Sequence, residues 1–402
     1  MNNSEIIALS DRYVMTTYAR HPVAFVRGKG AYLWDADGKK YLDFLAGIAV
    51  NGLGHAHPAI VEAVSAQAGR LIHTSNLFYN QSQAELAEWL CKNSFAGRAF
   101  FCNSGAEANE ASVKLARIYQ KQKKGEGCHE ILTMEKSFHG RTLGMIAATG
   151  QEKVKKGFEP LPEGFRHIPF DDLQALAAAM NDKTCAVLLE PVQGEGGVRY
   201  PSPGYLPGVR ELCKKHGALL IYDEVQCGMG RTGKLFAYQH SGVAPDIMSL
   251  AKSLGAGLPI GACLATEEVA AAFQPGTHAS TFGGNFLVCE AAKAFLRVLL
   301  EPGFLEKVRQ TGAYLVERLR GLQKKYPFVK EVRGEGLMVG IELEIPGKPL
   351  VEAALQEGLV INAAQEKVLR LVPPLIVGNK EIDEAVDILE DVFAQASGGV
   401  PG

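Results

Sequence analysis

Short apolar runs alternate with amphipathic segments through the middle of the chain. Runs typical of buried strands occupy residues 99–102, 130–134, 186–190, 219–223 and 247–251. Segments with helical periodicity lie before or between them, at residues 58–70, 82–92, 106–121, 173–180 and 204–216. Nearly continuous apolar strands that alternate with helices indicate a mainly parallel sheet covered by helices on both faces. The pattern therefore predicts an α/β fold.

The two ends of the chain show a different pattern. Residues 10–58 carry turn signals around strand-like runs at 31–34 and 41–44, which predict hairpin-like structure rather than helix. After about residue 290 the pattern becomes helical, with later strands at 336–343 and 369–371, a final helix at 380–393 and a disordered tail at 394–402. We expect a large domain over residues 59–290, and a smaller α+β domain formed by residues 291–402 together with the N-terminal segment 1–58.

Composition narrows the class of protein. The chain has 402 residues, of which 47% are hydrophobic and 21% charged, as in ordinary globular proteins. The formal net charge of −2 gives no reason to expect a nucleic acid or an anionic membrane as partner. No secretory signal or membrane-spanning run is recognisable. The eight cysteines form no Cys-x-x-Cys pair, which favours a reduced, cytoplasmic setting.

Polar residues close the predicted strands, and ligands of such sheets bind at the carboxyl ends of the strands. These residues are Asn103 with Ser104, Glu190, Asp223 and Lys252. An amine at the end of a buried strand, such as that of Lys252, has a lowered pKa and can attack a carbonyl carbon. We therefore treat these residues as one group of candidates.

Ser104-Gly-Ala-Glu107 follows a strand and opens a helix. The free N–H groups and the helix dipole suit a phosphate, while Gly105 lets the backbone approach a ligand closely. A capping box between Ser104 and Glu107 explains the same residues without any ligand, so both interpretations stay open.

Two other chemistries are less well supported by the sequence. His55 and His57 could form half of a metal site, but no third ligand is near in sequence, and we expect no metal. The acidic strand end at Asp223 and the glycine-rich stretch before Lys234 resemble parts of a P-loop ATPase. However, Leu235 follows Lys234 where such a loop needs Ser or Thr for magnesium.

The candidate residues together match one cofactor. Lys252 offers an amine, Asp223 an acid, Phe138 an aromatic plate and the helix after Ser104 a phosphate site. Pyridoxal 5′-phosphate presents an aldehyde, a ring nitrogen, a flat ring and a phosphate, so each group has a counterpart.

At this point the chain resembles the class III aminotransferases of fold type I, pyridoxal-phosphate-dependent enzymes, over nearly its whole length. The matching stretches, in the family's order, are Ser104-Gly-Ala-Glu-Ala-Asn-Glu110, Phe138-His-Gly-Arg-Thr142, Asp223-Glu-Val-Gln226 with Gly228-Met-Gly-Arg-Thr-Gly233, Ala251-Lys252, and Ser280-Thr-Phe-Gly-Gly-Asn285.

The resemblance implies a role for each cofactor-binding residue. Lys252 would form the Schiff base with the cofactor and later move the proton, and Asp223 would pair with the ring nitrogen. The remaining contacts would come from Phe138 and Val225 on the two ring faces, Gln226 at the ring hydroxyl, and Ser104, Gly105 and Ala106 at the phosphate. Thr281 would reach the phosphate of the neighbouring subunit, which implies a homodimer with shared active sites.

Within the family the resemblance is greatest to the acetylornithine aminotransferases, which transfer the terminal amino group of N2-acetylornithine to 2-oxoglutarate. It implies that Arg141, with Ser280 nearby, holds the distal carboxylate of the substrate. Arg370 would hold the second carboxylate of glutamate, and Glu195 would neutralise Arg370 when acetylornithine is bound. Ile48 stands where ornithine aminotransferases carry a tyrosine for the free α-amine, so an acylated amine is favoured.

Alternatives remain open on donor and activity. A 4-aminobutyrate, ornithine or succinylornithine aminotransferase would share most of these motifs. A non-enzymatic regulator of the same fold that keeps the cofactor without turnover is the alternative of another class. The presence of Lys252, Asp223, Arg141 and Arg370 argues against it.

Overall fold

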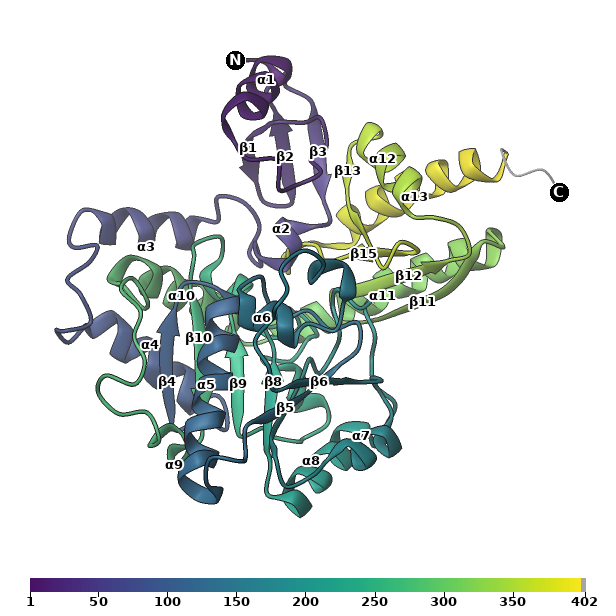
Figure 1. Ribbon diagram of the computed structural model, residues 1–402. Coiled ribbons are helices and arrows are strands. Elements are labelled where there is room, and N and C mark those ends of the chain that lie inside the picture. Colours follow the sequence, from purple (N-terminus) through teal and green to yellow (C-terminus); the bar gives the residue numbers. More distant parts are fainter. Residues whose placement is uncertain (399–402) are drawn as a thin grey trace.

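The computed structural model describes residues 1–398 (Figure 1). Its α-helices are α1 (Asn3–Tyr13), α2 (Ala46–Ala49), α3 (Pro58–Ala68), α4 (Gln81–Lys92), α5 (Gly105–Lys124), α6 (Leu143–Ala148), α7 (Leu173–Ala179), α8 (Tyr205–His216), α9 (Glu267–Ala270), α10 (Phe286–Leu299), α11 (Phe304–Lys325), α12 (Lys348–Gln356) and α13 (Asn379–Ser397). Its strands are β1 (Phe25–Lys29), β2 (Tyr32–Asp35), β3 (Lys40–Asp43), β4 (Arg98–Cys102), β5 (Glu130–Met134), β6 (Phe165–Ile168), β7 (Thr184–Leu189), β8 (Leu219–Asp223), β9 (Ile247–Leu250), β10 (Gly261–Ala265), β11 (Val329–Glu335), β12 (Met338–Leu343), β13 (Leu359–Val360), β14 (Asn362–Ala364) and β15 (Val368–Leu371).

A seven-stranded sheet forms the centre of the molecule, in the order β4-β10-β9-β8-β7-β5-β6. β5 to β9 pair in parallel, whereas β10 runs antiparallel to both β4 and β9. Helices lie against the sheet, with α5 across β9 and β10 and α7 and α8 near β6 and β8 (Figure 1). The predicted α/β fold with a mainly parallel sheet is therefore confirmed.

Two smaller sheets lie beside this centre. The first joins β1, β2 and β3 to β13, so the N-terminal hairpins pair with a strand from near residue 360. The second contains β11, β12, β15 and β14, with α11 against β11. A strand near the N-terminus thus pairs with one from the C-terminal part of the chain, while the assignment of both ends to one smaller domain, with boundaries at residues 58 and 290, stays a prediction.

Two expectations about the ends of the chain are wrong in part. Residues 10–13 are helical, because α1 begins with an Asn2–Glu5 capping box and ends at Tyr13. The final helix α13 extends to Ser397, so residues 394–397 belong to no disordered tail. Residues 399–402 lie outside the described residues.

α2 is a turn of left-handed helix. Ala46, Gly47, Ile48 and Ala49 have φ angles from 51° to 64°, a conformation that costs about 1–2 kcal/mol for each residue with a side chain. The Asp43 carboxylate accepts the N–H of Ala46 at 2.8 Å, and the Ser253 hydroxyl donates to the carbonyl of Ala49 at 2.8 Å. The strained turn is thus held from both sides, next to Lys252.

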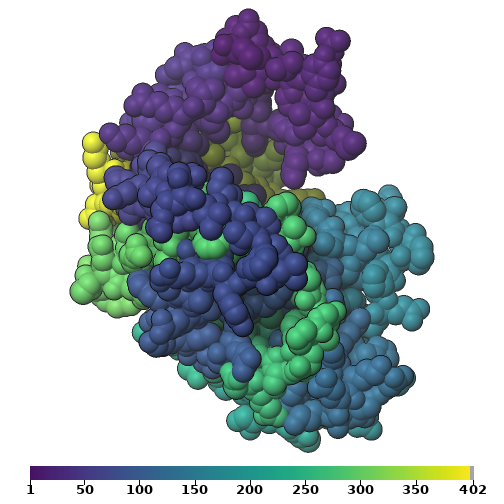
Figure 2. Space-filling model, turned by 90° about the vertical axis from the view of Figure 1, so that its left-hand side faces the viewer, coloured from purple at the N-terminus to yellow at the C-terminus, as the bar shows by residue number. Residues whose placement is uncertain are grey.

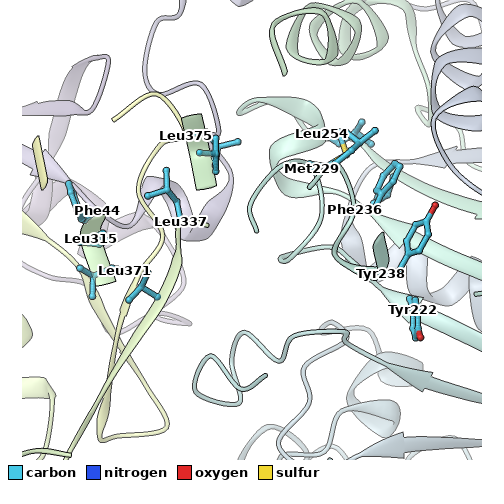
Figure 3. Close-up of a cluster of buried hydrophobic side chains, with 14 of the residues drawn as sticks. Phe44, Tyr222, Met229, Phe236, Tyr238, Leu254, Leu315, Leu337, Leu371 and Leu375 are labelled. Atoms are coloured by element: carbon cyan, nitrogen blue, oxygen red, sulfur yellow. The ribbon is translucent and has the colours of Figure 1, made fainter. Parts of the chain in front are cut away.

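A continuous hydrophobic core connects the large sheet to the C-terminal sheet. On the side of the large sheet it includes Tyr222 of β8 and Phe236. On the side of the C-terminal sheet it includes Leu371 of β15 and Leu337, which lies between β11 and β12 (Figure 3). No helix within residues 1–398 combines the length and apolar composition needed to cross a membrane.

Candidate active site

A cavity of about 450 Å³ lies where the parallel strands end. Its walls come from the segments that follow β4, β5, β7, β8 and β9, together with Val50 and residues 257–260. The candidate residues among them are Asn103, Ser104, Gly105, Ala106, Phe138, Arg141, Glu190, Asp223, Val225, Gln226 and Lys252. The polar residues that close the strands therefore do line one cavity.

Lys252 follows β9 directly and lines this cavity. Its backbone φ is 46°, in the left-handed region that residues with side chains seldom adopt. Burial lowers the pKa of its ammonium, because the charged form is poorly solvated there. A larger fraction of neutral amine results, which is the form that acts as a nucleophile or base.

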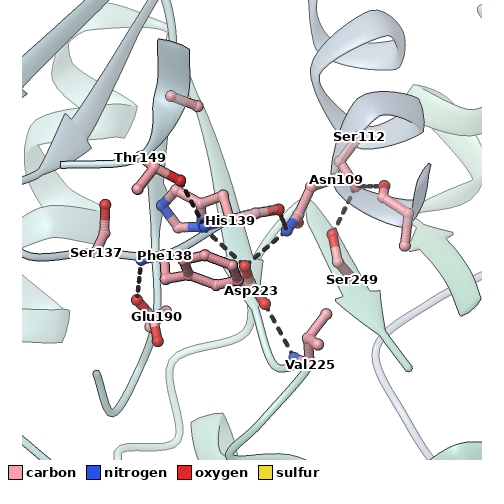
Figure 4. Close-up of polar contacts among 12 residues, drawn as sticks. Asn109, Ser112, Ser137, Phe138, His139, Thr149, Glu190, Asp223, Val225 and Ser249 are labelled. Carbon is pink, nitrogen blue, oxygen red and sulfur yellow. Dashed lines mark hydrogen bonds and ion pairs between the residues drawn. The ribbon is translucent and has the colours of Figure 1, made fainter. Parts of the chain in front are cut away.

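Asp223 ends β8 and is 3% exposed. Figure 4 shows its polar contacts. Its Oδ2 accepts the side-chain N–H of Asn109 at 2.7 Å and lies 2.8 Å from Nδ1 of His139, while Oδ1 accepts the N–H of Val225 at 3.0 Å. The carboxylate therefore has a fixed orientation at the cavity wall. Asn109 and His139 were not among the predicted site residues, although both lie inside the quoted motifs.

The start of α5 forms a backbone cradle. The Ser104 hydroxyl accepts the N–H of Glu107 at 3.2 Å, so half of the capping box is present. Glu107 does not complete it, because its carboxylate accepts the N–H of Asn103 at 2.7 Å instead. A Cβ at Gly105 would lie 2.7 Å from Val225 Cγ1, so only glycine fits. Capping by Ser104 thus coexists with a half-buried first turn of the helix, in which Gly105 and Ala106 line the cavity.

Arg370 of β15 is fully buried and does not line the cavity itself, but it contacts Gln226, which does. Its Nη1 donates to Glu195 Oε1 at 2.5 Å and to Gln226 Oε1 at 3.0 Å, while Nε donates to Asn362 Oδ1 at 3.1 Å. Burial raises the pKa of Glu195, but the charges of Arg370 and Lys252 and the hydrogen bonds from Arg370 and Gln226 together outweigh this effect and lower the pKa overall. Among the described residues, Arg370 Nη2 has no hydrogen-bond partner. A buried donor is therefore left for a further acceptor.

Arg141 lines the cavity with its guanidinium 5.5 Å from the centre of the Phe138 ring. Ser280 does not line the cavity itself, but its hydroxyl accepts from the side chain of Asn103 at 3.2 Å. Thr281 is exposed and does not line the cavity of its own chain. Ile48 is 37% exposed on the left-handed turn and is absent from the cavity wall, where Val50 lies instead.

The metal-site alternative finds no support within residues 1–398, where no three His, Cys, Asp or Glu side chains are grouped to hold an ion. His55 pairs instead with Asp43, at 2.7 Å between Nε2 and Oδ2. This pair supports the carboxylate that caps the left-handed turn.

Comparisons with family models, known sequences and solved structures give consistent matches. Residues 13–393 match the family model of aminotransferase class III. The acetylornithine aminotransferase of Caldanaerobacter subterraneus subsp. tengcongensis is 53% identical over 391 residues, covering 97% of this chain and 99% of that protein. That of Methanocaldococcus jannaschii is 50% identical over 395 residues, covering 98% and 99%. The fold is also similar to an ornithine aminotransferase structure from Toxoplasma gondii with pyridoxal phosphate at partial occupancy, with a TM-score of 0.94, 35% identity and coverage of 98% and 95%.

Proposed function

The chain belongs to the class III aminotransferase family, and from this premise we propose that it moves the terminal amino group of N2-acetylornithine to 2-oxoglutarate. The products are N-acetylglutamate 5-semialdehyde and glutamate, a step of arginine biosynthesis. The observation that carries the choice of donor is an identity of about 50% to acetylornithine aminotransferases over nearly the whole chain. The chain is an enzyme on this proposal, and not a regulator that only retains a cofactor.

Class III aminotransferases use pyridoxal 5′-phosphate, and the cavity residues fit it. The carboxylate of Asp223 suits the ring nitrogen, and the cradle at Gly105, which a Cβ would fill, suits the phosphate. When bound, the cofactor supplies a ring that accepts the electron pair left on the substrate carbon. The other residues that would hold it are Ser104, Ala106, Phe138, Val225 and Gln226.

The chain's own contribution to the chemistry is the placement of a base beside the substrate carbon. The lowered pKa of Lys252 favours the neutral amine, and its Nζ would take the proton from that carbon and hold it for a later transfer. Asn109 and His139 hold Asp223 in one orientation, so its negative charge is fixed before substrate arrives.

Two arginines provide for two substrates of different shape. Arg141, with Ser280 near it, would hold the distal carboxylate in both half reactions, because it is an accessible cation on the cavity wall. Arg370 would hold the second carboxylate of glutamate through its unpartnered Nη2. With acetylornithine bound, Glu195 would keep Arg370 neutralised, as the 2.5 Å contact supports.

A homodimer with shared sites completes the proposal. Exposed apolar side chains lie on two segments. Leu77 and Phe78, on the segment before α4, are 88% and 69% exposed, and Phe282, on the segment before α10, is 59% exposed. The two segments adjoin, because Asn76 donates to the carbonyls of Ser280 and Gly283, and both lie on the face shown in Figure 2. A second copy covering this face would bury these side chains and bring Thr281 toward the partner's cradle.

The test replaces Lys252 by Ala. Turnover of acetylornithine with 2-oxoglutarate should disappear, together with the cofactor that borohydride fixes covalently to the chain. Lys234→Ala, at the exposed lysine of the glycine-rich stretch, is the matched control and should keep both properties. Full activity of Lys252→Ala would contradict the proposal.

Ornithine is the donor that most needs comparison, because the Toxoplasma gondii neighbour is an ornithine aminotransferase. Steady-state rates with acetylornithine, ornithine, succinylornithine and 4-aminobutyrate, each with 2-oxoglutarate, decide between them. A higher kcat/KM for ornithine would overturn the choice of donor and the specificity role of Ile48.

A further inference from the structure

Glu190 is a buried carboxylate with both oxygens bound to backbone. It directly follows β7, lines the cavity and is 4% exposed. Oε1 accepts the N–H of Phe138 at 3.0 Å (Figure 4), and Oε2 accepts the N–H of Gly194 at 3.0 Å. One side chain therefore ties the loop after β5 to the loop after β7.

Each loop carries a group that faces substrate or cofactor in the proposed function. Phe138 lines the cavity, and so does Arg141, which follows it on the same loop. Gly194 immediately precedes Glu195, whose carboxylate contacts Arg370. A Cβ at Gly194 would lie 2.3 Å from the Gln226 side chain, so this backbone packs directly on the residue that also accepts from Arg370.

Keeping a carboxylate at this position is unfavourable in itself. Burial and the nearby Asp223 charge together raise the pKa of Glu190 to about 7, even though His139 and the two backbone hydrogen bonds act to lower it. Hydrogen bonds from N–H groups to a carboxylate are stronger than those to an amide oxygen. Burying the carboxylate of Glu190 is unfavourable, and yet each of its oxygens accepts a backbone N–H from a different loop. Such a group is expected to have a positioning role.

We propose that Glu190 is a positioning residue that sets the balance between the two substrates by fixing Gly194, and through it the reach of Glu195 to Arg370. The inference rests on the proposed function for the roles of Glu195 and Arg370. Acetylornithine leaves Arg370 without a substrate carboxylate, so its half reaction needs Glu195 in place. Glutamate brings its own carboxylate, so its half reaction depends less on Gly194.

The test compares Glu190→Gln with Glu224→Gln. Glu224 is a matched control: it is fully buried beside Asp223 and accepts two backbone N–H groups, of Ala237 at 2.6 Å and Tyr238 at 2.7 Å, but it does not line the cavity. A glutamine keeps one acceptor and turns an N–H group toward the other backbone N–H. In Glu190→Gln, the ratio of kcat/KM for acetylornithine to kcat/KM for glutamate should fall about tenfold, as expected for loss of one buried, charge-assisted hydrogen bond. In Glu224→Gln it should change less than about twofold.

Amide hydrogen exchange of the holoenzyme gives a readout that does not depend on turnover. Peptides covering residues 136–141 or 191–197 should exchange at least about tenfold faster in Glu190→Gln than in the wild type or in Glu224→Gln. If Glu190→Gln does not fold, the shorter carboxylate of Glu190→Asp is measured, with the same direction expected in both assays.

An unchanged substrate ratio, or unchanged exchange in both peptides, overturns the inference. If the wild type does not use acetylornithine, the proposed function fails instead, and the exchange data still decide whether Glu190 holds the two loops.

Discussion

Removing the negative charge of Glu195 tests how the site accepts two substrates. Arg370 is fully buried, and its Nη1 has Glu195 at 2.5 Å as its charged partner. Deleting one member of a buried ion pair costs about 3–5 kcal/mol. Glu195→Gln keeps an acceptor oxygen, and Gln226 and Asn362 still accept from Arg370. We therefore expect a smaller cost, about 2 kcal/mol, for any state in which no substrate carboxylate reaches Arg370.

This cost should appear in one half reaction and not in the other. At about 1.4 kcal/mol per factor of ten, kcat/KM for acetylornithine should fall about 30-fold. When glutamate is the substrate, its own carboxylate pairs with Arg370 in place of Glu195. The kcat/KM for glutamate should therefore stay within about threefold of the wild-type value, or rise because the competing carboxylate of Glu195 is removed.

The assay follows each half reaction separately, in single-turnover experiments that monitor cofactor absorbance with acetylornithine or glutamate alone. Glu342→Gln is the control, because Glu342 also pairs with an arginine, Arg333 at 2.6 Å, in the same small sheet but outside the cavity. It should leave both half reactions unchanged. An equal loss in both half reactions of Glu195→Gln would refute the reasoning, since Glu195 would then not stand in for a substrate carboxylate.

Two further predictions concern Arg141 and Glu224. Arg141→Ala should lower kcat/KM for acetylornithine and for glutamate alike, by about 10- to 100-fold, because both would place a distal carboxylate on it; loss with only one substrate in steady-state assays contradicts this assignment. Burial raises the pKa of Glu224 from 4.5 to about 8, so its protonated form stabilises the folded chain fully below pH 4.5, and this stabilisation is lost as the pH rises toward 8. From pH 5 to 8, the free energy of unfolding should fall less in Glu224→Gln than in the wild type, by at most about 4 kcal/mol; parallel denaturant curves across this range would contradict that expectation.

The sequence predicts the large sheet well because its parallel strands are buried on both faces. The predicted bounds of β5 and β8 agree with the structure, since each strand is mainly apolar and almost fully buried. The gathering of Ser104, Glu190, Asp223 and Lys252 in one cavity follows from the same rule, that parallel strands end at one edge of a sheet. β10 was missed, because its small residues Gly261 and Ala262 follow a turn-rich stretch and hold no strong strand signal.

Contacts between residues far apart in the chain, and strained backbone conformations, could not be predicted from the local sequence pattern. Nothing in residues 46–49 other than Gly47 favours a left-handed turn; the carboxylate of Asp43 and the hydroxyl of Ser253 hold it from positions before and far after it in the chain. Consequently Ile48, expected at the substrate by resemblance, lies off the cavity wall and Val50 lies on it. The polar network of Asn109 and His139 around Asp223 also depends on three separate elements meeting.

The antiparallel strand β10 has a consequence for how the protein is made. β4 is synthesised before the other strands of its sheet, yet it pairs with β10, whose residues emerge from the ribosome roughly 160 positions later. At about 5–20 residues per second, β4 waits on the order of 8 to 30 seconds for its neighbour. During that interval its unpaired edge and the apolar side of α5 are open to other nascent chains, so chaperones that act during translation should matter most for the stretch between residues 98 and 265.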